Sequence, residues 1–555
     1  MTTPMLTCKQ LSVYLGNPQK CILNNASAHF GLAGMHAVIG PSGCGKTTLV
    51  KAMLSILPST GHTNFQGQAI ESDTALSGRL AFVPQFSIAA PQLTVAEVLS
   101  FALELQVLDP AIRQQRFDTS LERIGLEACR DTRVANLSGG QLRRLGLGIE
   151  LIADPDCIVC DEVTSGLDPR SEDSILEMLQ SLRDESGKAF ICIIHNLNKL
   201  DYFDTTTVVY EGAVVFQGHL SALKKYFSIS DPLQLYDRLS QHTVEEWNDR
   251  WAREQPSVSD KAEATSACLQ QRPKMRDQVQ TLLKRRALLF VRDRAYWMLT
   301  LSITLGFPLL VAIFAWDGLP ELRGLALTHD GGFLERIESS LRFRMDAIQT
   351  ASLVTGLILF QVILLTLIGS NNGAREIAAE RTLYEKERFA GLNPYAYAIS
   401  KLIFSGSIAC LQGLWMTVFV KTVCDFPGPL LGQSLILILA CFSMTLVCLG
   451  LSAVLASAEK ASLLSVYLVG FQLPLSGIVL ALPEGLVDLC RPFIIAYWAW
   501  AGYFATMIDT RLYDAFRLES NELIPNTGLA SLILGLHAIF GAFLVFYGCI
   551  QKRPL

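Results

Sequence analysis

Charge is scarce in this sequence, and it is unevenly distributed. Only 17% of the 555 residues are charged and 50% are hydrophobic, whereas charged residues make up about 25% of typical soluble domains. The charges concentrate in the first half of the chain, and the second half contains long uncharged tracts. Because the chain is also too long for one ordinary domain, we expect a soluble N-terminal half and a membrane-embedded C-terminal half.

Long basic runs are missing as well. The net charge is −5 and no stripe of Lys and Arg stands out, which disfavours nucleic acid as a partner. The first ten residues, MTTPMLTCKQ, have neither the basic nor the apolar region of a secretory signal peptide. We therefore expect the first apolar span to direct membrane insertion.

Metal-binding spacing is also hard to find. The eight histidines form no cluster, and among fourteen cysteines only CIVC, residues 157–160, has the C-x-x-C spacing. No second pair exists, and a spacing of three along a strand directs the two sulfurs to opposite faces. Filler of a buried strand is therefore favoured over a zinc or redox site.

The first 230 residues alternate short apolar runs with amphipathic stretches. The apolar runs indicate buried strands of a parallel sheet at 36–39, 80–83, 157–160 and 190–194. The stretches between them indicate helices at 46–57, 95–107, 141–153 and 171–185. This alternation predicts an α/β domain over residues 1–239.

Two connecting segments follow this domain. Residues 240–272 are polar and irregular, and we predict a linker there. Residues 273–294 are basic and amphipathic and predict a connecting helix. This helix lies either on the cytoplasmic membrane surface or against the N-terminal half.

Residues 295–555 are predicted to form an all-α transmembrane domain of six helices. Each tract can hold the roughly 20 residues that cross a hydrocarbon core. The predicted spans are 295–316, 347–370, 398–420, 430–457, 461–483 and 527–550. The aromatic stretch 492–508 is short and follows Pro492, which favours a re-entrant or interfacial segment.

Six crossings place both termini on one side of the membrane. Basic residues flank the first and the last span, which predicts that this side is cytoplasmic. These residues are Arg285, Arg286, Arg292, Arg294, Lys552 and Arg553.

The segment GPSGCGKTT matches the phosphate-binding pattern G-x-x-x-x-G-K-[ST], and it lies between a predicted strand and a predicted helix. Its glycines let backbone N–H groups turn toward phosphate oxygens, Lys46 can reach the β- and γ-phosphates, and Thr47 can ligate Mg²⁺. We therefore predict an ATP site with bound Mg²⁺. Its residues are Gly40, Pro41, Ser42, Gly43, Cys44, Gly45, Lys46, Thr47 and Thr48.

Two carboxylates end the strand at 157–160. Asp161 can hold Mg²⁺ through water, and Glu162 can act as the general base that polarises an attacking water. The pair lies about 115 residues after the phosphate-binding segment GPSGCGKTT, which is called the P-loop below. An Asp-Glu dipeptide alone would be weak support for these two roles, but its place after a phosphate-binding segment makes the support strong.

With further motifs in order, residues 1–225 resemble the nucleotide-binding domain of ATP-binding cassette (ABC) transporters. The resemblance implies that Gln85, in VPQ, contacts Mg²⁺ and water and links to the membrane domain. It implies that His195, in IIHN, contacts the γ-phosphate. In place of the family's usual proline after the glutamate stands Val163, which affects only the expected loop geometry.

The segment LSGGQ, residues 137–141, resembles the family signature. Ser138 can cap the helix that follows, and Gly139 and Gly140 leave backbone N–H groups bare for an anion, next to Gln141. The resemblance implies that this signature faces ATP held by a second subunit, so a twofold dimer completes two sites.

Two more residues belong to this expectation. Asp168, in SGLD, resembles the family's D-loop near the dimer seam. Tyr14 either stacks on adenine, as an aromatic does in relatives, or packs in the core.

The domain order resembles the G subfamily of half-transporters, the White/Scarlet type. Residues 375–403 resemble that subfamily's coupling segment, although an ordinary solvated loop is the alternative. Substrate-cavity candidates are Phe360, Phe471, Ile478 and Val479, although helix packing or lipid contact is the favoured alternative for these residues. Two functions follow as alternatives: ATP-driven export of an apolar small molecule or lipid, by a dimer with itself or a similar half-transporter, or ATP-gated membrane regulation without transport.

Overall fold

The computed structural model describes residues 4–16, 19–70, 78–85, 88–254, 272–315, 333–424, 426–478, 483–519 and 524–551. The chain divides into two compact units. The N-terminal unit comprises Met1–Thr281, Thr382–Asn393 and Arg553–Leu555. The helical unit comprises Leu282–Arg381 and Pro394–Lys552.

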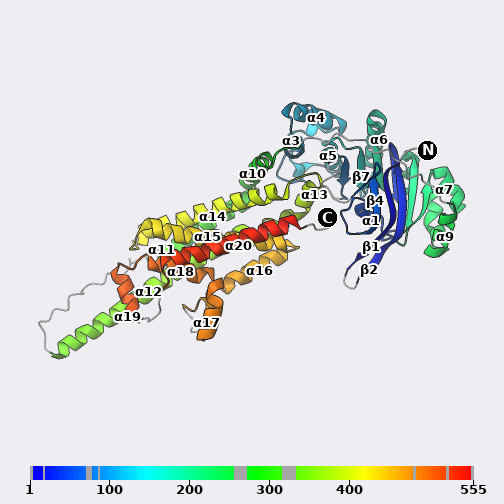
Figure 1. Cartoon of the computed structure of the whole chain (residues 1–555). Helices are drawn as coiled ribbons and strands as arrows, with labels where there is room; N and C mark the ends of the chain where they lie inside the picture. Colours follow the sequence, from blue (N-terminus) through cyan, green and yellow to red (C-terminus); the bar gives the residue numbers. More distant parts are fainter. Residues whose placement is uncertain are drawn as a thin grey trace. The chain divides into compact units, whose positions relative to one another are not determined.

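A six-stranded sheet that includes β7 lies within the N-terminal unit (Figure 1). Its strand order is β10-β9-β3-β8-β7-β6. All neighbours in it are parallel except β9 and β10. The strands are β3 (Gly34–Ile39), β6 (Leu80–Val83), β7 (Cys157–Asp161), β8 (Ala189–Ile193), β9 (Thr205–Tyr210) and β10 (Ala213–Gly218). The four predicted strands are confirmed, and β3, β6, β7 and β8 are buried along their whole length.

A second, antiparallel sheet has the order β2-β1-β4-β5. Its strands are β1 (Pro4–Leu15), β2 (Lys20–Gly31), β4 (Thr60–Phe65) and β5 (Gln68–Ala69). Helix α1 (Lys46–Met53) contributes Leu49 and Val50 to an apolar core shared with both sheets. The P-loop precedes α1 and is therefore held by a well-packed element.

The predicted helices of this unit form, with ends set by capping residues. They are α1, α3 (Val95–Gln106), α5 (Gly139–Leu151) and α6 (Pro169–Ser186); α4 (Pro110–Arg123) and α7 (Leu220–Phe227) also belong to the unit. Thr94 and Glu97 form a capping box on α3, and Asp168 caps α6 before Pro169. Each cap satisfies N–H groups that have no partner within the helix.

The predicted linker at 240–272 is wrong in its first part. After α8 (Leu235–Leu239), helix α9 spans Val244–Glu254. Trp247 and Trp251, one turn apart, are buried beside Tyr226 and Phe216. Burial of two indole rings holds this polar helix on the unit despite its charge. Residues 255–271 lie outside the described part.

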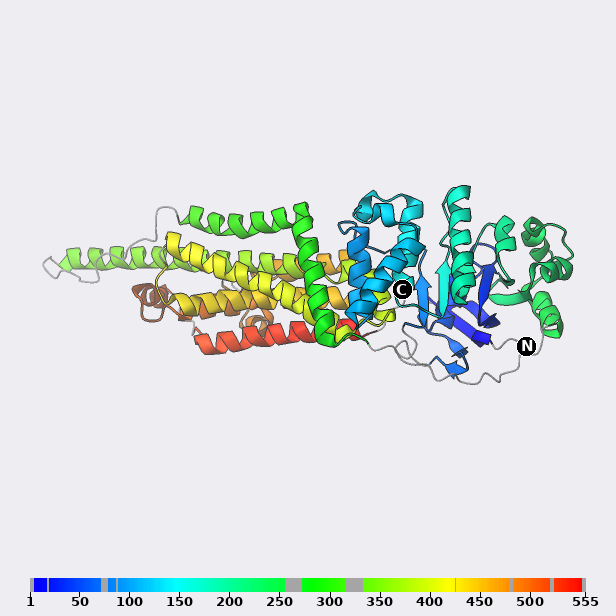
Figure 2. The same cartoon turned by 90° about the horizontal axis from the view of Figure 1, so that it is seen from above.

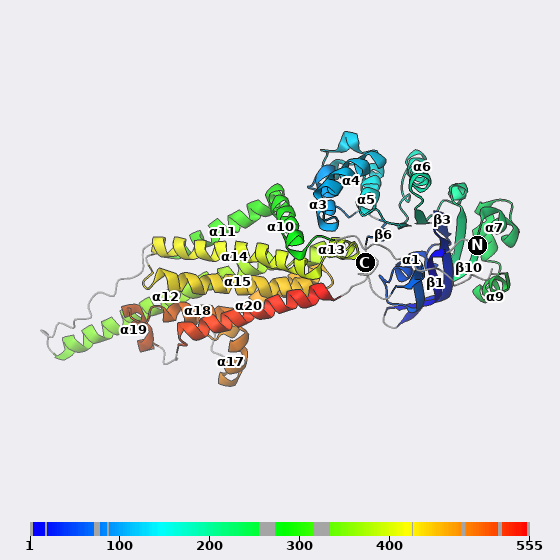
Figure 3. The ribbon, with the colours of Figure 1, turned by 45° about the horizontal axis from the view of Figure 1, so that its top comes forward.

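The helical unit contains five helices long and apolar enough to cross a membrane, counted over the described residues. Figures 2 and 3 show them running side by side. They are α11 (Arg294–Phe314), α12 (Phe333–Gly373), α14 (Pro394–Cys424), α15 (Leu430–Val454) and α20 (Thr527–Ile550). Five of the six predicted spans thus lie on long helices. The connecting helix forms as α10 (Met275–Arg292).

The predicted crossing at 461–483 is not one continuous helix. Helix α16 spans only Ala458–Gly470, and a short 3-10 turn at Pro474–Ser476 follows it. Pro474 has no N–H to donate, and Gly477 takes a left-handed φ of 72° that ends the turn. Thirteen residues rise only about 20 Å, too little to cross a ~30 Å core.

The segment predicted as re-entrant or interfacial, 492–508, contains helix α18 (Ile495–Ala505). It has eleven residues, and residues 495–504 are all buried. It packs between α12, α15 and α20. A helix this short, enclosed by three long ones, fits the re-entrant alternative. Helices α17 (Glu484–Cys490) and α19 (Arg511–Glu519) flank it.

Helix α12 is longer than its predicted span. Its 41 residues begin at Phe333, in the stretch between the first two predicted spans. At 1.5 Å per residue it extends about 60 Å, twice the hydrocarbon thickness. Its first turns project past the neighbouring helices (Figures 1 and 2).

Candidate nucleotide site

The P-loop lies between β3 and α1, as the sequence predicts. Lys46 is buried, and its ammonium donates to the carbonyls of Gly40 at 2.9 Å and Pro41 at 3.0 Å. Gly45 has φ 103°, and a Cβ there would come within 3.2 Å of Ile22 O. Only glycine fits at this turn. Lys46 thus lies folded back on the loop that would surround the phosphates.

The carboxylate of Glu162 lies at the centre of the site. Gln85 Nε2 donates to its Oε2 at 2.8 Å, and His195 Nε2 lies 2.6 Å from its Oε1. Gln85 follows β6, Glu162 follows β7 and His195 follows β8, three adjacent strands. The carboxyl ends of parallel strands meet at one edge of a sheet, which is why residues so far apart in sequence come together.

Asp161 and Thr47 form a second contact in the site. Thr47 Oγ1 donates to Asp161 Oδ1 at 3.0 Å. Burial raises the pKa of Asp161, and the hydrogen bond from Thr47 opposes this effect. Two adjacent hard oxygen donors next to a phosphate loop suit Mg²⁺, which prefers such ligands.

Ser138 and Gln141 begin helix α5 with a capping box. Ser138 Oγ accepts from Gln141 N at 3.3 Å, and Gln141 Oε1 accepts from Ser138 N at 2.9 Å. Ser138 and Gly139 are exposed, and Gly140 lies against Ser171 of α6. Among the described residues, none of the hydrogen bonds of this helix start reaches the P-loop or Glu162.

Comparisons with known proteins agree with this geometry. A family model for "ABC transporter" matches residues 23–165, and one for "ABC-2 type transporter" matches 277–504. The chain belongs to the ABC transporters. Its nucleotide-binding half comes first and its membrane half second, and with five long apolar helices it is an integral membrane protein.

Relatives match one or both halves of this transporter. An ABC transporter ATP-binding/permease protein of Mycobacterium tuberculosis is 26% identical over 532 residues, covering 91% of this chain and 57% of that protein. ABC transporter G family members 26 and 7 of Arabidopsis thaliana are 33% and 34% identical, over 38% of this chain and 32% and 31% of theirs. The chain thus spans less than two thirds of each of these relatives.

Arg143 is a residue of the transporter's site that sequence reasoning missed. It lies on α5, two residues after the signature, and burial lowers its pKa while the charge of Glu162 opposes that effect. Helix α5 therefore brings a cation toward the central carboxylate. The signal in the sequence is the pair Arg143-Arg144 soon after LSGGQ, within the helix predicted at 141–153.

Asp168 caps a helix, and Tyr14 is an exposed residue of a strand. Asp168 Oδ1 accepts from Ser171 N at 3.0 Å and so caps α6. Tyr14 is 50% exposed on β1, so the core-packing alternative is wrong. Stacking on adenine stays a prediction.

Part of the predicted coupling segment belongs to the N-terminal unit. Helix α13 spans Arg381–Phe389, and Lys386 forms an ion pair with Glu150 of α5 at 2.9 Å. Both side chains are buried. The Gly391 carbonyl and the Asn393 N–H meet the side-chain amide of Gln278, at the start of α10. The solvated-loop alternative does not fit these contacts.

The substrate-cavity candidates are scattered over the helical unit. Phe360 contacts Phe314 edge to face, with ring centroids 5.5 Å apart. Phe471 is 56% exposed at the end of α16, and Ile478 packs partly buried against the unit's core. Val479 lies outside the described residues. The structure therefore does not bring these candidates together.

Proposed function

We propose that this chain is an ATP-hydrolysing half-transporter that works as a dimer and exports an apolar or amphipathic molecule. One observation carries this proposal: Glu162 is held by Gln85 and His195 at the sheet edge beside the P-loop. A carboxylate fixed by two neighbours at a phosphate site is suited to align and deprotonate a water.

Each of the proposed roles rests on the chemistry of its side chain. Lys46 would leave the Gly40 and Pro41 carbonyls to bind the β- and γ-phosphates. Mg²⁺ would be held by Thr47, Gln85 and Asp161, and when bound it would neutralise charge on the phosphates. Glu162 would take the proton of the water, and His195, whose Nε2 lies 2.6 Å from Glu162 Oε1, would orient that carboxylate and reach the γ-phosphate.

Dimerisation is supported by the exposed start of α5. Helix N-termini with bare N–H groups bind anions. The start of α5 is such an N-terminus, and among the described residues its hydrogen bonds do not reach the P-loop of the same chain. It is formed by Ser138, Gly139, Gly140 and Gln141. A second subunit's ATP would complete it, and Asp168 would lie near that seam. One signature and one P-loop per chain fit a twofold arrangement.

The ATP cycle would reach the membrane through α13. The buried pair of Lys386 with Glu150 joins α13 to the signature helix α5, so movement of α5 on ATP closure would move α13. Following the distribution of basic residues, the nucleotide-binding domain and both termini would face the cytoplasm.

The replacement Glu162→Gln tests this proposal. In proteoliposomes, we expect ATP turnover to fall by about 10²–10³-fold, because the general base is lost. With ATP, the variant should also accumulate as a dimer in size-exclusion chromatography with light scattering. Glu122→Gln on the exposed face of α4 is the matched control and should behave as wild type.

Two results would contradict the proposal. A monomer with full ATPase activity would exclude the shared site. Normal ATPase activity without movement of any compound in a panel of lipids and apolar molecules would favour an ATP-gated regulator instead.

A further inference from the structure

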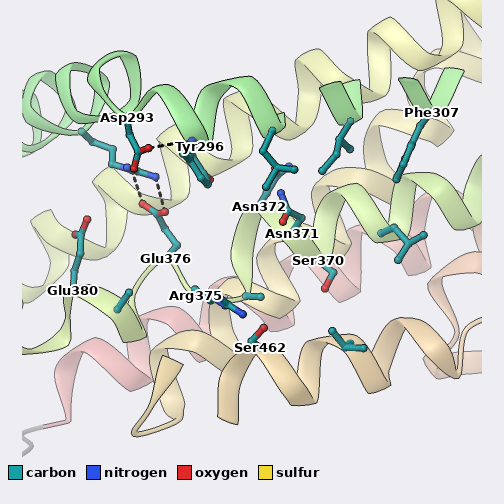
Figure 4. Close-up of a pocket in the computed structure, with 17 residues that line it drawn as sticks. Asp293, Tyr296, Phe307, Ser370, Asn371, Asn372, Arg375, Glu376, Glu380 and Ser462 are labelled. Atoms are coloured by element: carbon teal, nitrogen blue, oxygen red, sulfur yellow. Dashed lines mark hydrogen bonds and ion pairs between the residues drawn. The ribbon is translucent and has the colours of Figure 1, made fainter. Parts of the chain in front are cut away.

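The helical unit contains a cavity of about 700 Å³ that the nucleotide chemistry does not use. Its walls come from α10, α11, the end of α12, the segment that follows α12, and α16 (Figure 4). The segment after α12 leads to α13. The cavity is therefore bounded by the membrane helices and by the chain segment that precedes α13.

The lining changes from charged to apolar along the cavity. Glu376 and Glu380 lie at one end in Figure 4, and Phe307 lies at the other. Apolar walls are provided by Leu299, Ile303, Phe307, Leu367 and Val466. Leu299 and Val466 are 50% and 61% exposed, so an apolar chain can enter from the side. Such a gradient matches a molecule with a polar head and an apolar tail.

The carboxylates at the charged end already have partners. Arg286 Nη2 donates to Glu376 Oε2 at 2.6 Å. Lys401 Nζ donates to Glu376 Oε1 at 2.9 Å and to Glu380 Oε2 at 2.7 Å. A cationic ligand would have to displace these pairs. Asp293 is also engaged, because its Oδ1 caps α11 by accepting from Tyr296 N at 3.0 Å.

Arg375 differs from these residues. It lines the cavity and is exposed, and its side chain makes no hydrogen bond or ion pair with the other residues that the structure describes. Ser462 lies beside it, and Asn371 lies on the last turn of α12, four residues before Arg375 (Figure 4). A guanidinium presents a planar set of donors that matches phosphate and carboxylate oxygens.

We propose that this cavity binds an amphiphile whose head group carries anionic oxygens, with the head on Arg375 and the tail along α11 and α16. Ser462 and Asn371 donate to the remaining head-group oxygens. The apolar part lies against Ile303, Phe307 and Val466. This assignment gives a substrate class to the proposed export function and rests on it only for transport, not for binding.

Photolabelling of the purified full-length chain in a neutral sugar detergent tests the site. The probes are a diazirine-bearing dodecyl phosphate, the matching alcohol and the matching trimethylammonium. We expect the phosphate to label peptides of α11, α16 and the end of α12 about tenfold more than the alcohol, because a charged hydrogen bond is gained. Unlabelled dodecyl phosphate should displace it. Equal labelling by the alcohol, or preferred labelling by the ammonium, would overturn the inference.

Variants of Arg375 assign the contact. Arg375→Gln should lower phosphate labelling about tenfold, and Arg375→Lys should keep part of it because the charge remains. The matched control is Arg344→Gln, which replaces an exposed arginine of α12 that has no partner among the described residues; its labelling should equal wild type. Unchanged labelling in Arg375→Gln would overturn the assignment, as would an equal loss in Arg344→Gln. Unchanged elution on size exclusion shows that each variant is folded.

A transport assay in proteoliposomes distinguishes a transported amphiphile from a resident membrane lipid as the source of the anionic head group. ATP-dependent movement of the labelled phosphate in wild type, lost in Glu162→Gln, identifies a transported amphiphile. Labelling without such movement identifies a resident membrane lipid, which supports the cavity and counts against export. If ATPase activity is intact but no labelling occurs, this inference fails while the proposed function stands.

Discussion

Glu162 shows at the scale of one residue how this site departs from ordinary backbone geometry. It has a left-handed φ of 53°, a region that non-glycine residues seldom adopt. The next residue, Val163, is buried and replaces the family's usual proline. The fold therefore supplies the turn without proline, and anchors it through the hydrogen bonds of Glu162 to Gln85 and His195. Strain of this kind is typical of functional sites.

Thr47 carries the first prediction at this scale. Thr47→Val removes the hydroxyl that contacts Asp161 at 3.0 Å and keeps the side-chain shape. We expect the Mg²⁺ concentration for half-maximal ATPase activity to rise at least about tenfold. A Mg²⁺ titration of turnover measures it, and Thr47→Ser, which keeps the hydroxyl, should remain close to wild type. An equal rise in this Mg²⁺ concentration in Thr47→Val and Thr47→Ser would show that packing of the side chain, and not the hydroxyl, is responsible.

His36, on the strand that leads to the P-loop, makes a pH prediction. Burial lowers its pKa to about 4, against the opposing charge of Asp204, while its Nδ1 pairs with Thr205 Oγ1 at 2.7 Å. In the unfolded chain its pKa is about 6.5. Between these values the unfolded chain binds more protons, so stability falls as the pH drops below about 6.5 and levels off below about 4.

The measurement is the first thermal transition of the full chain in detergent. Between pH 6.5 and pH 5, wild type should lose about 2 kcal/mol through His36, or about 5 °C in Tm. The His36→Gln variant has no group that titrates at this position. Its loss of stability between pH 6.5 and pH 5 should therefore be smaller than that of wild type by about 2 kcal/mol. His62→Gln, at an exposed position, should show the wild-type dependence; a flat wild-type profile would exclude the effect.

At the scale of elements, the sequence predicts those whose signals are local. The P-loop, the four buried strands and the capped helices α3 and α6 follow from motif, period and caps. Helix α9 was missed because its charge resembles a linker, although Thr243 and Glu246 form a capping box and two Trp lie one turn apart. The broken crossing at α16 was missed because hydropathy ignores Pro474 and Gly477. The gathering of Gln85, Glu162 and His195 depends on strand order, which composition does not encode.

The joint between α13 and α5 makes an element-scale prediction. Lys386→Met leaves the carboxylate of Glu150 buried without its partner, because both side chains are less than a tenth exposed. We expect a loss of about 3 kcal/mol in stability. Lys386→Met with Glu150→Leu should recover most of it, since no buried charge is left. The control Arg342→Met breaks the exposed pair with Glu338 and should cost less than about 1 kcal/mol. The measurement is thermal unfolding of wild type and the three variants. If the double variant is no more stable than Lys386→Met, the loss comes from altered packing and not from the unpaired charge.

For the whole molecule, the number of membrane crossings follows from which helix ends meet. Arg381, the first residue of α13, donates to Gly548 O of α20, at 3.2 Å, and to Ala453 O of α15. Ile377, four residues after α12, donates its N–H to Ser452 Oγ of α15 at 3.1 Å. The ends of α12, α15 and α20 therefore lie together. The chain from the end of α15 to the start of α20 must run to the opposite end of the unit, from which α20 returns. Helix α16, although too short to span alone, takes the outward path.

This arrangement predicts that a tag after Leu555 shares the side of the nucleotide-binding domain, whereas a tag between α11 and α12 lies on the other side. In sealed vesicles that hydrolyse externally added ATP, added protease should remove the first tag and spare the second. Detergent should expose both, which is the control for sealing. A protected C-terminal tag would mean an odd number of crossings. It would contradict this arrangement, in which Arg381, eight residues after α12, is hydrogen-bonded to the end of α20.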